Sequence, residues 1–323
     1  MKFGYGLITC QRPPDDSRTD AEIYRDAIDR AVAAERAGFD SVWVSEHHFL
    51  DDGYMPSLLV TCAAIAQATS RITIGTAVLL APLYDPWRLA EDAATVDVIS
   101  NGRFVLGMGA GWRPEEFDVL GVSQNDRGKL MNRTVKVLRG AWSDEAFEGV
   151  NVTPKPAHPI PIWLGGSAPA AVKRAGRIGD GFLGSTSGMS GIDAFAQAKQ
   201  LALEARGSTD GFTFALHVPV YVGEWDDVKQ HYHYLRWKYP DMGAARGSTQ
   251  AKSPPPLTPE IEAQLKPTII CGSSDDVVAQ VAQFRDALGD DTHFIFRNDF
   301  PGMPQDESLE QIDRLAKDVV PQF

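Results

Sequence analysis

Short apolar runs alternate with longer amphipathic segments along the whole chain. Each run has the length of a strand, and a run such as Val42-Trp43-Val44 shows no polar alternation. Continuous apolar runs of this kind are typical of parallel strands buried on both faces. The predicted strands are Lys2–Thr9, Phe39–Ser45, Arg71–Leu80, Arg103–Met108, Ile160–Leu164, Gly181–Gly184, Phe212–Val222 and His293–Arg297.

Helical patterns fill the intervals between these runs. Thr19 and Glu22 form the sequence of a capping box, and Gly38 ends the helix that follows. At Asp85-Pro86 the proline takes the first helical position of another helix, which ends at Asn101-Gly102. The other predicted helices are Ser57–Thr69, Asp126–Trp142, Pro169–Ile178, Ile192–Ala205, Asp275–Ala287 and Ser308–Val319.

Eight strands that alternate with helices predict an α/β fold, a single (β/α)8 (TIM) barrel domain over residues 1–323. A doubly wound open sheet is the alternative, because alternation alone does not reveal closure. An insertion at about residues 224–266, between the seventh and eighth strands, interrupts the rhythm. In barrels such insertions form a lid or binding loop, and a subunit contact is an equal alternative here.

Composition narrows the class of protein. Of 323 residues, 43% are hydrophobic, and 31 Lys and Arg against 43 Asp and Glu leave a formal charge of −12. This balance provides a large core but no basic excess for nucleic acid or an anionic membrane. No apolar stretch approaches the roughly 18 residues of a membrane helix. The three cysteines, Cys10, Cys62 and Cys271, have no paired spacing, so we expect free thiols in a cytoplasmic protein.

The second predicted strand ends in polar residues, where barrel enzymes place their active sites. Glu46, His47 and His48 follow Ser45, and strand alternation directs Glu46 and His48 one way and His47 the other. A histidine at such a position can exchange protons near neutral pH, or it can be a core histidine satisfied by Glu46. The spaced, converging ligands that zinc needs are not evident, so no metal is predicted and a metal-dependent hydrolase is a weak alternative.

The run Gly107-Met108-Gly109-Ala110-Gly111-Trp112 ends the fourth predicted strand. It departs from a dinucleotide-binding fingerprint because Trp112 replaces the small sixth residue. Its backbone lacks Cβ atoms at alternate positions, so a flat ring could approach it closely. Tight packing of strand and loop explains the same glycines.

A second glycine-rich turn, Gly165-Gly166-Ser167, leads directly into a predicted helix. Free N–H groups at a helix N-terminus, together with a serine hydroxyl, can bind an anion such as phosphate. Ordinary loops share this composition, so the turn alone does not establish a ligand. The other side chains expected at this anion site are Arg127, Ser185, Thr186 and Ser187.

Taken together, several segments resemble the bacterial luciferase-like family of barrel oxidoreductases. They keep the family's order over most of the chain, and only the insertion is hard to place. The segments are Met1–Gly4, Gly38–Phe49, Ile74–Val78, Asp85-Pro86, Gly102–Gly107, Glu116-Phe117 with Gly121, and Gly179–Phe182.

The resemblance implies a (β/α)8 barrel that binds reduced flavin mononucleotide (FMN) or the deazaflavin coenzyme F-420 at the strand ends. His47 corresponds to the family's catalytic histidine, and Glu46 would orient it. Ala77 and Val78 fall where the family has a cis peptide bond behind the ring. These roles follow from the resemblance alone.

The resemblance also assigns Gly166, Ser167 and Arg127 to the cofactor phosphate. Luciferases place a second phosphate-binding arginine where this chain has Ala110, so Arg113 or the hydroxyls of Ser185-Thr186-Ser187 would have to replace it. Gly109-Ala110-Gly111-Trp112 is similar to the deazaflavin-dependent members. Glu46-His47-His48-Phe49 is instead similar to the flavin branch.

We therefore expect a monooxygenase that uses reduced FMN and O2 on a small apolar or carbonyl-bearing molecule, with a separate flavin reductase as partner. The alternative is hydride transfer by the deazaflavin coenzyme without oxygen, and a non-catalytic flavin-binding protein is a third hypothesis. Family barrels often pair through early helices, so we expect a homodimer, with Ser57–Thr69 as a candidate surface. The expected walls of the substrate pocket are Leu7, Trp112, Trp225, Tyr232, Tyr234 and Trp237.

Overall fold

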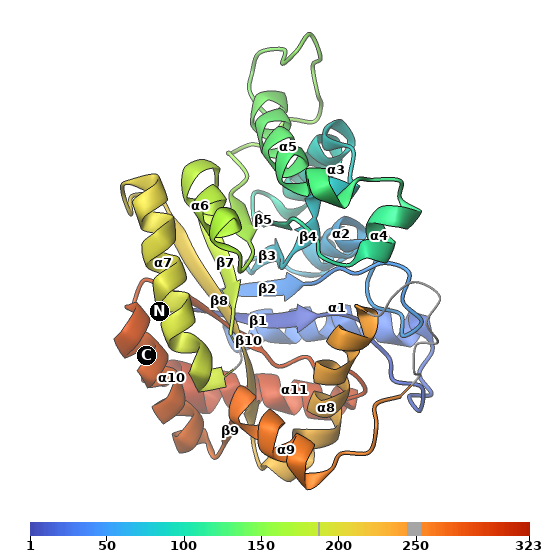
Figure 1. Cartoon of the computed structure of the whole chain (residues 1–323), viewed down its shortest axis with the longest axis vertical. Helices are drawn as coiled ribbons and strands as arrows, with labels where there is room; N and C mark the ends of the chain where they lie inside the picture. Colours follow the sequence, from blue (N-terminus) through green and yellow to red (C-terminus); the bar gives the residue numbers. More distant parts are fainter. Residues whose placement is uncertain (187, 244–252) are drawn as a thin grey trace.

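Eight parallel strands form a closed barrel in the computed structural model, which describes residues 1–186, 188–243 and 253–323 (Figure 1). The ring closes because β10 pairs with both β1 and β8, so His293 lies opposite Lys2 on one side and Ala215 on the other. This confirms the predicted TIM barrel over the open sheet. The barrel strands are β1 (Lys2–Ile8), β2 (Ser41–Val44), β3 (Thr73–Thr76), β5 (Phe104–Gly109), β6 (Ile162–Gly165), β7 (Gly181–Ser185), β8 (Thr213–Val222) and β10 (His293–Arg297).

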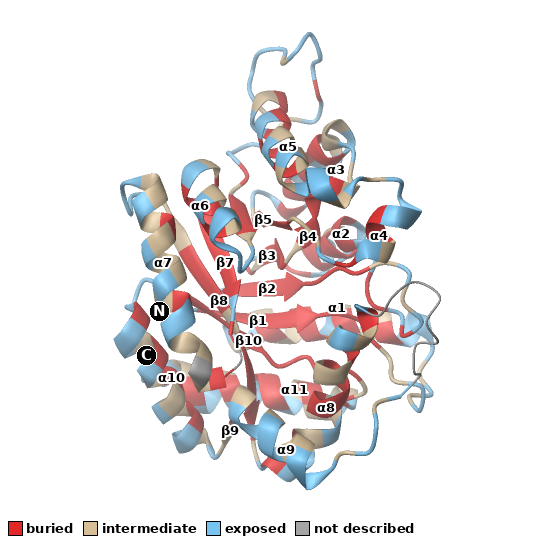
Figure 2. Cartoon of the chain, viewed as in Figure 1, coloured by how far each residue is buried: buried red, intermediate tan, exposed pale blue. Residues whose placement is uncertain are grey.

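Helices surround the barrel and turn their apolar faces inward, as Figure 2 shows by the buried inner and exposed outer residues. The Thr19–Glu22 capping box is present, and Gly38 ends α1 in the left-handed conformation, φ 96°. The outer helices are α1 (Asp20–Ala37), α2 (Leu58–Ala68), α3 (Pro86–Ser100), α5 (Arg127–Ala141), α6 (Pro169–Ile178), α7 (Ile192–Arg206), α10 (Ser274–Leu288) and α11 (Gln305–Arg314).

The predicted third strand is interrupted in the structure. It divides into β3 and the short β4 (Leu79–Leu80), which pairs with β5. The Ala77–Val78 peptide between them is cis, as the resemblance implied. The chain therefore leaves the barrel wall at this point and returns two residues later.

The insertion between the seventh and eighth barrel strands contains two helices that the sequence pattern did not predict. They are α8 (Trp225–Met242) and α9 (Pro259–Leu265), and the short β9 (Ile270–Gly272) then pairs with β8. A further short helix, α4 (Pro114–Val119), follows β5. Both α4 and α8 contribute to the site described below.

Aromatic and aliphatic side chains fill the interior of the barrel. Trp43 and Trp163 stack there with ring centroids 5.1 Å apart. Gly75 leaves room for Trp43, because a Cβ on Gly75 would lie 2.2 Å from the indole. Leu7 and Leu183 belong to the same cluster and also line the cavity above it. The packed interior is therefore the floor of a cavity at the carboxyl ends of the strands.

Candidate active site

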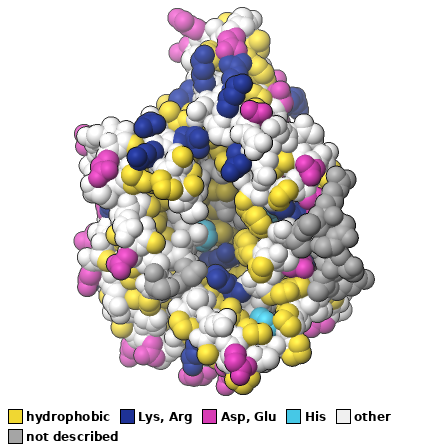
Figure 3. Space-filling view, viewed as in Figure 1, with side chains coloured by type: hydrophobic (Ala, Val, Ile, Leu, Met, Phe, Trp, Pro, Cys, Tyr) yellow, Lys and Arg dark blue, Asp and Glu magenta, His cyan; other side chains and the backbone are white. Residues whose placement is uncertain are grey.

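A cavity of about 720 Å³ lies at the carboxyl ends of the barrel strands. Figure 3 shows it as a hollow that contains basic side chains and a histidine beside hydrophobic ones. A volume of this order is typical of pockets for cofactors and small molecules. The predicted site residues that line it are Glu46, His47, Ala77, Val78, Gly109, Ala110, Arg127, Gly165, Gly166, Ser167, Ser185 and Thr186. The prediction for Ser187 lies outside the described residues.

His47 is held by Glu116 from α4, rather than by Glu46. Its Nδ1 lies 2.8 Å from Glu116 Oε1, and the same oxygen accepts the backbone N–H of His48 at 2.9 Å. Since a carboxylate only accepts hydrogen bonds, Nδ1 carries the proton and Nε2 is the ring nitrogen left for chemistry. Tyr54 and Trp112 contact the imidazole edge-on, with centroids 4.9 and 5.9 Å away. This contact fixes the plane of the ring.

The buried Glu46 pairs instead with the half-buried His48, so the expectation that Glu46 orients His47 is wrong. Side-chain alternation had placed Glu46 and His48 on one side and His47 on the other, and the structure agrees. The carboxylate also accepts the Tyr84 hydroxyl at 3.0 Å and the Leu80 N–H at 3.3 Å. Burial raises the pKa of Glu46 although these hydrogen bonds oppose the shift. Burial lowers the pKa of His48, but hydrogen bonding to Glu46 and the charge of Glu46 outweigh it, and the net shift is upward.

The break between β3 and β4 forms one wall of the cavity. Val78 points from this wall toward two glycines, and a Cβ on Gly109 would lie 2.5 Å from its Cγ2. A Cβ on Gly165 would lie 3.0 Å from the other methyl group. The glycines therefore let the backbone of β5 and β6 approach Val78, which keeps this wall flat and apolar.

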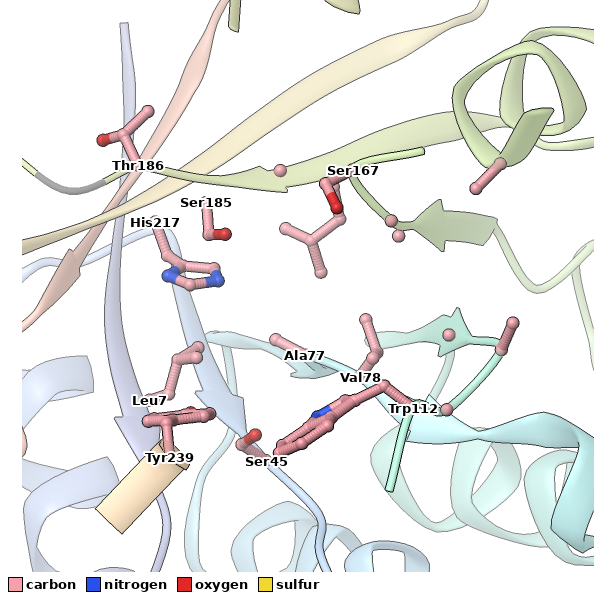
Figure 4. A pocket seen from close by; sticks show the side chains of 18 of the residues that line it. Leu7, Ser45, Ala77, Val78, Trp112, Ser167, Ser185, Thr186, His217 and Tyr239 are labelled. Carbon is pink, nitrogen blue, oxygen red and sulfur yellow. The ribbon is translucent and has the colours of Figure 1, made fainter. Parts of the chain in front are cut away.

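Polar groups collect at the side of the cavity opposite Tyr239 and Trp112, where Figure 4 places Ser167, Ser185 and Thr186. Ala168, the N-cap of α6, provides no side-chain hydrogen bond to the helix. The buried Oγ1 of Thr186 has no hydrogen-bond partner among the described residues. An uncapped helix N-terminus and an unpaired hydroxyl are suited to the oxygen atoms of an anion.

Arg113 cannot provide the additional charge that we considered for this anion. It is completely buried, and its guanidinium donates to the carbonyls of His48 and Met242 and pairs with Glu115. It does not line the cavity. Arg127 does, from the exposed first turn of α5, where it also donates to the Gln124 carbonyl at 2.8 Å.

The insertion supplies the remaining wall through Leu235, Arg236 and Tyr239 of α8. Leu7 and Trp112 line the cavity as expected. The other four aromatic residues that we expected there are absent from its lining: Trp225, Tyr232, Tyr234 and Trp237. Trp225 and Tyr232 instead pack in a separate apolar cluster on the inner face of α8.

The sequence analysis did not assign a role in the site to four residues in or beside the cavity: Glu116, His217, Tyr239 and Arg297. His217 is half-buried in the cavity wall, and removal from water together with the charge of Arg297 lowers its pKa to about 3, so it is neutral. Glu116 lay in a segment that carries the family resemblance, but its distance of 69 positions from His47 gave no sign of contact. For Tyr239 and Arg297 the sequence held no comparable signal.

Two kinds of feature are missing from the part of the chain that the structure describes. It contains no cluster of three or more His, Cys, Asp or Glu side chains able to hold a metal ion. It also contains no helix with the length and apolar character needed to cross a membrane.

The chain is similar to luciferase-like oxidoreductases in sequence and in fold. The sequence profile described as luciferase-like monooxygenase matches residues 1–291. The F420-dependent glucose-6-phosphate dehydrogenase of Kineococcus radiotolerans is 32% identical over 320 residues, which cover 91% of each chain.

Two solved structures share the fold at low sequence identity. An F420-dependent secondary alcohol dehydrogenase in complex with an F420-acetone adduct superposes with a TM-score of 0.74 at 22% identity, covering 99% of this chain and 98% of that one. The oxygenating constituent of 3,6-diketocamphane monooxygenase from Pseudomonas putida, in complex with FMN, gives 0.76 at 20% identity with the same coverage.

Proposed function

Because the chain belongs to the luciferase-like monooxygenase family of oxidoreductases, we propose that it uses the deazaflavin coenzyme F-420. It would transfer hydride between this coenzyme and the hydroxyl- or carbonyl-bearing carbon of a small organic molecule. The observation that carries the proposal is the 32% identity to an F420-dependent dehydrogenase over 91% of the chain. This reverses the order of our two cofactor hypotheses.

The loop after β5 supports the same choice. Ala110 stands where luciferases carry a phosphate-binding arginine, and Arg113, the substitute nearest in sequence, is buried with partners of its own. A flavin mononucleotide would therefore lack a cation that its phosphate is expected to need at this end. Gly109 and Ala110 line the cavity there without a charged side chain, which would suit a coenzyme whose tail needs no cation at this position.

The residues of the cavity fit a flat ring with an anionic tail. Val78 and Gly109 would face the ring, while Ser167, Thr186 and the N-terminus of α6 would hold the phosphoryl group. The Thr186 hydroxyl, buried without a partner among the described residues, is the observation that supports this fit most directly. When bound, the deazaflavin ring supplies hydride acceptance and donation.

His47 would hold and move a proton at the edge of that ring. Glu116 fixes its tautomer and the orientation of its ring, as the third member of a catalytic triad does. Leu7, Val78 and Trp112 would exclude water from the reacting atoms. Glu46 contributes indirectly, because its carboxylate accepts a hydrogen bond from the backbone N–H of Leu80, next to the cavity wall formed by Ala77 and Val78.

A second candidate is the monooxygenase that the sequence favoured, with reduced FMN, O2 and a separate flavin reductase. The Glu46-His47-His48-Phe49 segment supports it, and in the structure His47 and Glu46 are both among the residues that line the cavity. The two functions differ in whether oxygen is consumed.

An anaerobic titration of the purified protein with the deazaflavin coenzyme and, in parallel, with reduced FMN separates the two candidates. We expect the deazaflavin to bind at least about tenfold more tightly, and to be reduced by an alcohol, with glucose 6-phosphate and propan-2-ol as first probes. The variant His47→Ala should retain binding and lose reduction. Tight binding of reduced FMN alone, followed by oxygen uptake in air, would contradict the proposal and support the second candidate.

We further propose that the protein works in the cytoplasm as a homodimer. The apolar helix α2 exposes Val60, which is 73% accessible, and the neighbouring α3 exposes Val98 and Ile99. Exposed apolar side chains on two neighbouring helices favour burial against a second copy. Analytical ultracentrifugation of the wild type and Val60→Glu tests this, and a wild-type monomer would refute it.

A further inference from the structure

Arg297 is a buried cation whose electrostatic partner is a tyrosine. It ends β10 with 8% of its surface exposed. Two other buried arginines have carboxylates: Arg30 lies 3.4 Å from Asp299, and Arg113 pairs with Glu115. Within the described chain Arg297 forms no ion pair, and its Nε has no hydrogen-bond partner. A buried charge without a counterion is costly, so its surroundings must provide negative charge.

The group that meets this charge is the phenol of Tyr239. Arg297 Nη2 donates a hydrogen bond to Tyr239 Oη at 3.1 Å, and the guanidinium lies 5.4 Å from the centre of the ring. Tyr239 lies at the last turn of α8 and lines the cavity beside Leu7 and Ser45 (Figure 4). An oxygen that accepts from a guanidinium is stabilised in its ionised form.

Titratable and charged groups from three parts of the chain surround the phenol. They are Arg297 from β10, Arg236 from α8, and Tyr54 and His47 from the segment after β2. Burial raises the pKa of Tyr239, but the charge of Arg297 and hydrogen bonds involving Tyr54 and Arg297 outweigh burial, so the net shift is downward. The imidazole of His47 lies edge-on, 6.3 Å away between ring centroids.

We infer that Tyr239 is a second proton-transfer residue, the base that receives the proton of the substrate hydroxyl, and that Arg297 is its positioning residue. The inference rests on the proposed function and names the substrate group, an alcohol carbon that carries hydrogen. As the carbon–hydrogen bond breaks, hydride passes to the deazaflavin coenzyme, the oxidant. The hydroxyl proton passes to the Tyr239 phenolate, and the carbon–oxygen double bond forms.

The two proton sites then have separate tasks. His47 supplies the proton that the reduced coenzyme takes up, while Tyr239 removes the one that the substrate gives up, so one proton enters and one leaves for each hydride. Opposite tasks suit the different partners, because a carboxyl group holds His47 and a guanidinium holds Tyr239. Hydride transfer in the other direction reverses both steps.

Ultraviolet difference titration of the cofactor-free protein tests the ionisation of Tyr239 without any turnover. In the wild type we expect one tyrosine to ionise below the ordinary pKa of about 10. This transition should be lost in Tyr239→Phe and should move to higher pH in Arg297→Met. The matched control is Tyr234→Phe on the same helix, whose hydroxyl bonds to Asp52 outside the cavity and which should leave the transition unchanged. A wild-type titration without an early tyrosine, or one that survives in Tyr239→Phe, would overturn the inference.

Kinetics then test the transfer itself. For alcohol oxidation we expect Tyr239→Phe to lower kcat/KM by about 100-fold or more and to abolish the loss of rate at low pH, while the Kd of the coenzyme is unchanged. Arg297→Lys should retain activity with its pH dependence displaced upward. If the coenzyme binds and is reduced but Tyr239→Phe keeps the wild-type profile, the inference alone fails. If the coenzyme does not bind, the proposed function fails, whatever the titration shows.

Discussion

Replacing Glu116 by glutamine is the sharpest perturbation of the site, because it removes one charge and almost no volume. In the wild type both hydrogen bonds to Oε1, from His47 and from the backbone of His48, end on a completely buried carboxyl oxygen. The other oxygen, Oε2, has no hydrogen-bond partner among the described residues. In Glu116→Gln the carbonyl can accept the same two bonds, and the amide NH2 takes the unpaired position.

The expected size of the effect follows from these contacts. A hydrogen bond to a charged group contributes about 1.5–3 kcal/mol and a neutral one about 1 kcal/mol, so the two bonds together weaken by about 2 kcal/mol. This loss is felt when His47 carries its second proton, which the carboxylate stabilises and the amide does not. A barrier higher by about 2 kcal/mol corresponds to a kcat/KM lower by about 30-fold. The unpaired buried NH2 group should also reduce the free energy of unfolding by about 1–3 kcal/mol.

Steady-state reduction of the deazaflavin coenzyme by a substrate alcohol measures the first effect, and thermal unfolding measures the second. Asp118→Asn on the same helix is the control, because Asp118 is exposed and should change neither quantity. In a double-mutant cycle, Glu116→Gln should cause little further loss once His47 is alanine. A folded Glu116→Gln protein with kcat/KM within about threefold of wild type would show that His47 does not act through this carboxylate.

Three further predictions concern stability and cofactor binding. Gly107→Ala should lower the free energy of unfolding, measured by chemical denaturation, by about 3 kcal/mol, because the alanine Cβ would lie 1.9 Å from the Thr76 carbonyl oxygen. Gly128→Ala is the control and should be tolerated, because its Cβ would meet only the end of a flexible side chain. Burial lowers the pKa of His293 from 6.5 to about 3, so the unfolded chain binds more protons than the folded one between these values. The free energy of unfolding should therefore decrease, by up to about 5 kcal/mol, as the pH is lowered through this window, and His293→Gln should flatten the dependence. Ser167→Asp should weaken binding of the phosphorylated coenzyme by about tenfold or more, and an effect that does not shrink at high salt would exclude phosphate repulsion as its cause.

The barrel could be predicted because its strands are encoded locally. Runs such as Val42-Trp43-Val44 are apolar on both faces, and the capping box at Thr19 and the Asp85-Pro86 start fix two helices within a few residues. The break at Ala77-Val78 is not visible in hydrophobicity, since both halves of Arg71–Leu80 are apolar. The cis peptide at this position was expected from the family resemblance instead. Helix α8 was missed because its aromatic and charged residues point both to the core and to the cavity, which obscures the helical period.

The residues of the candidate site also fall into two groups, those that local sequence could predict and those that it could not. The glycine turns and His47 stand at strand ends, so their position in a barrel follows from the topology. Glu116 and Arg297 act through partners 69 and 58 positions away, and no local rule links such pairs. For Arg113, closeness in sequence was misleading. It follows the strand that was expected to border the phosphate site, but the packing of α4 and α8 directs its guanidinium to other acceptors.

The two halves of the cavity come from different parts of the fold. The surfaces proposed for the redox ring and its tail belong to barrel strands and the turns that follow them, which cannot move without disturbing the shared architecture. Leu235, Arg236 and Tyr239 belong to an excursion outside the repeating unit. Exchange of that excursion between homologous proteins would therefore change the reactant together with the group that accepts its proton, while the surfaces proposed for the ring and its tail stay the same, so diversification of this scaffold should concentrate in α8.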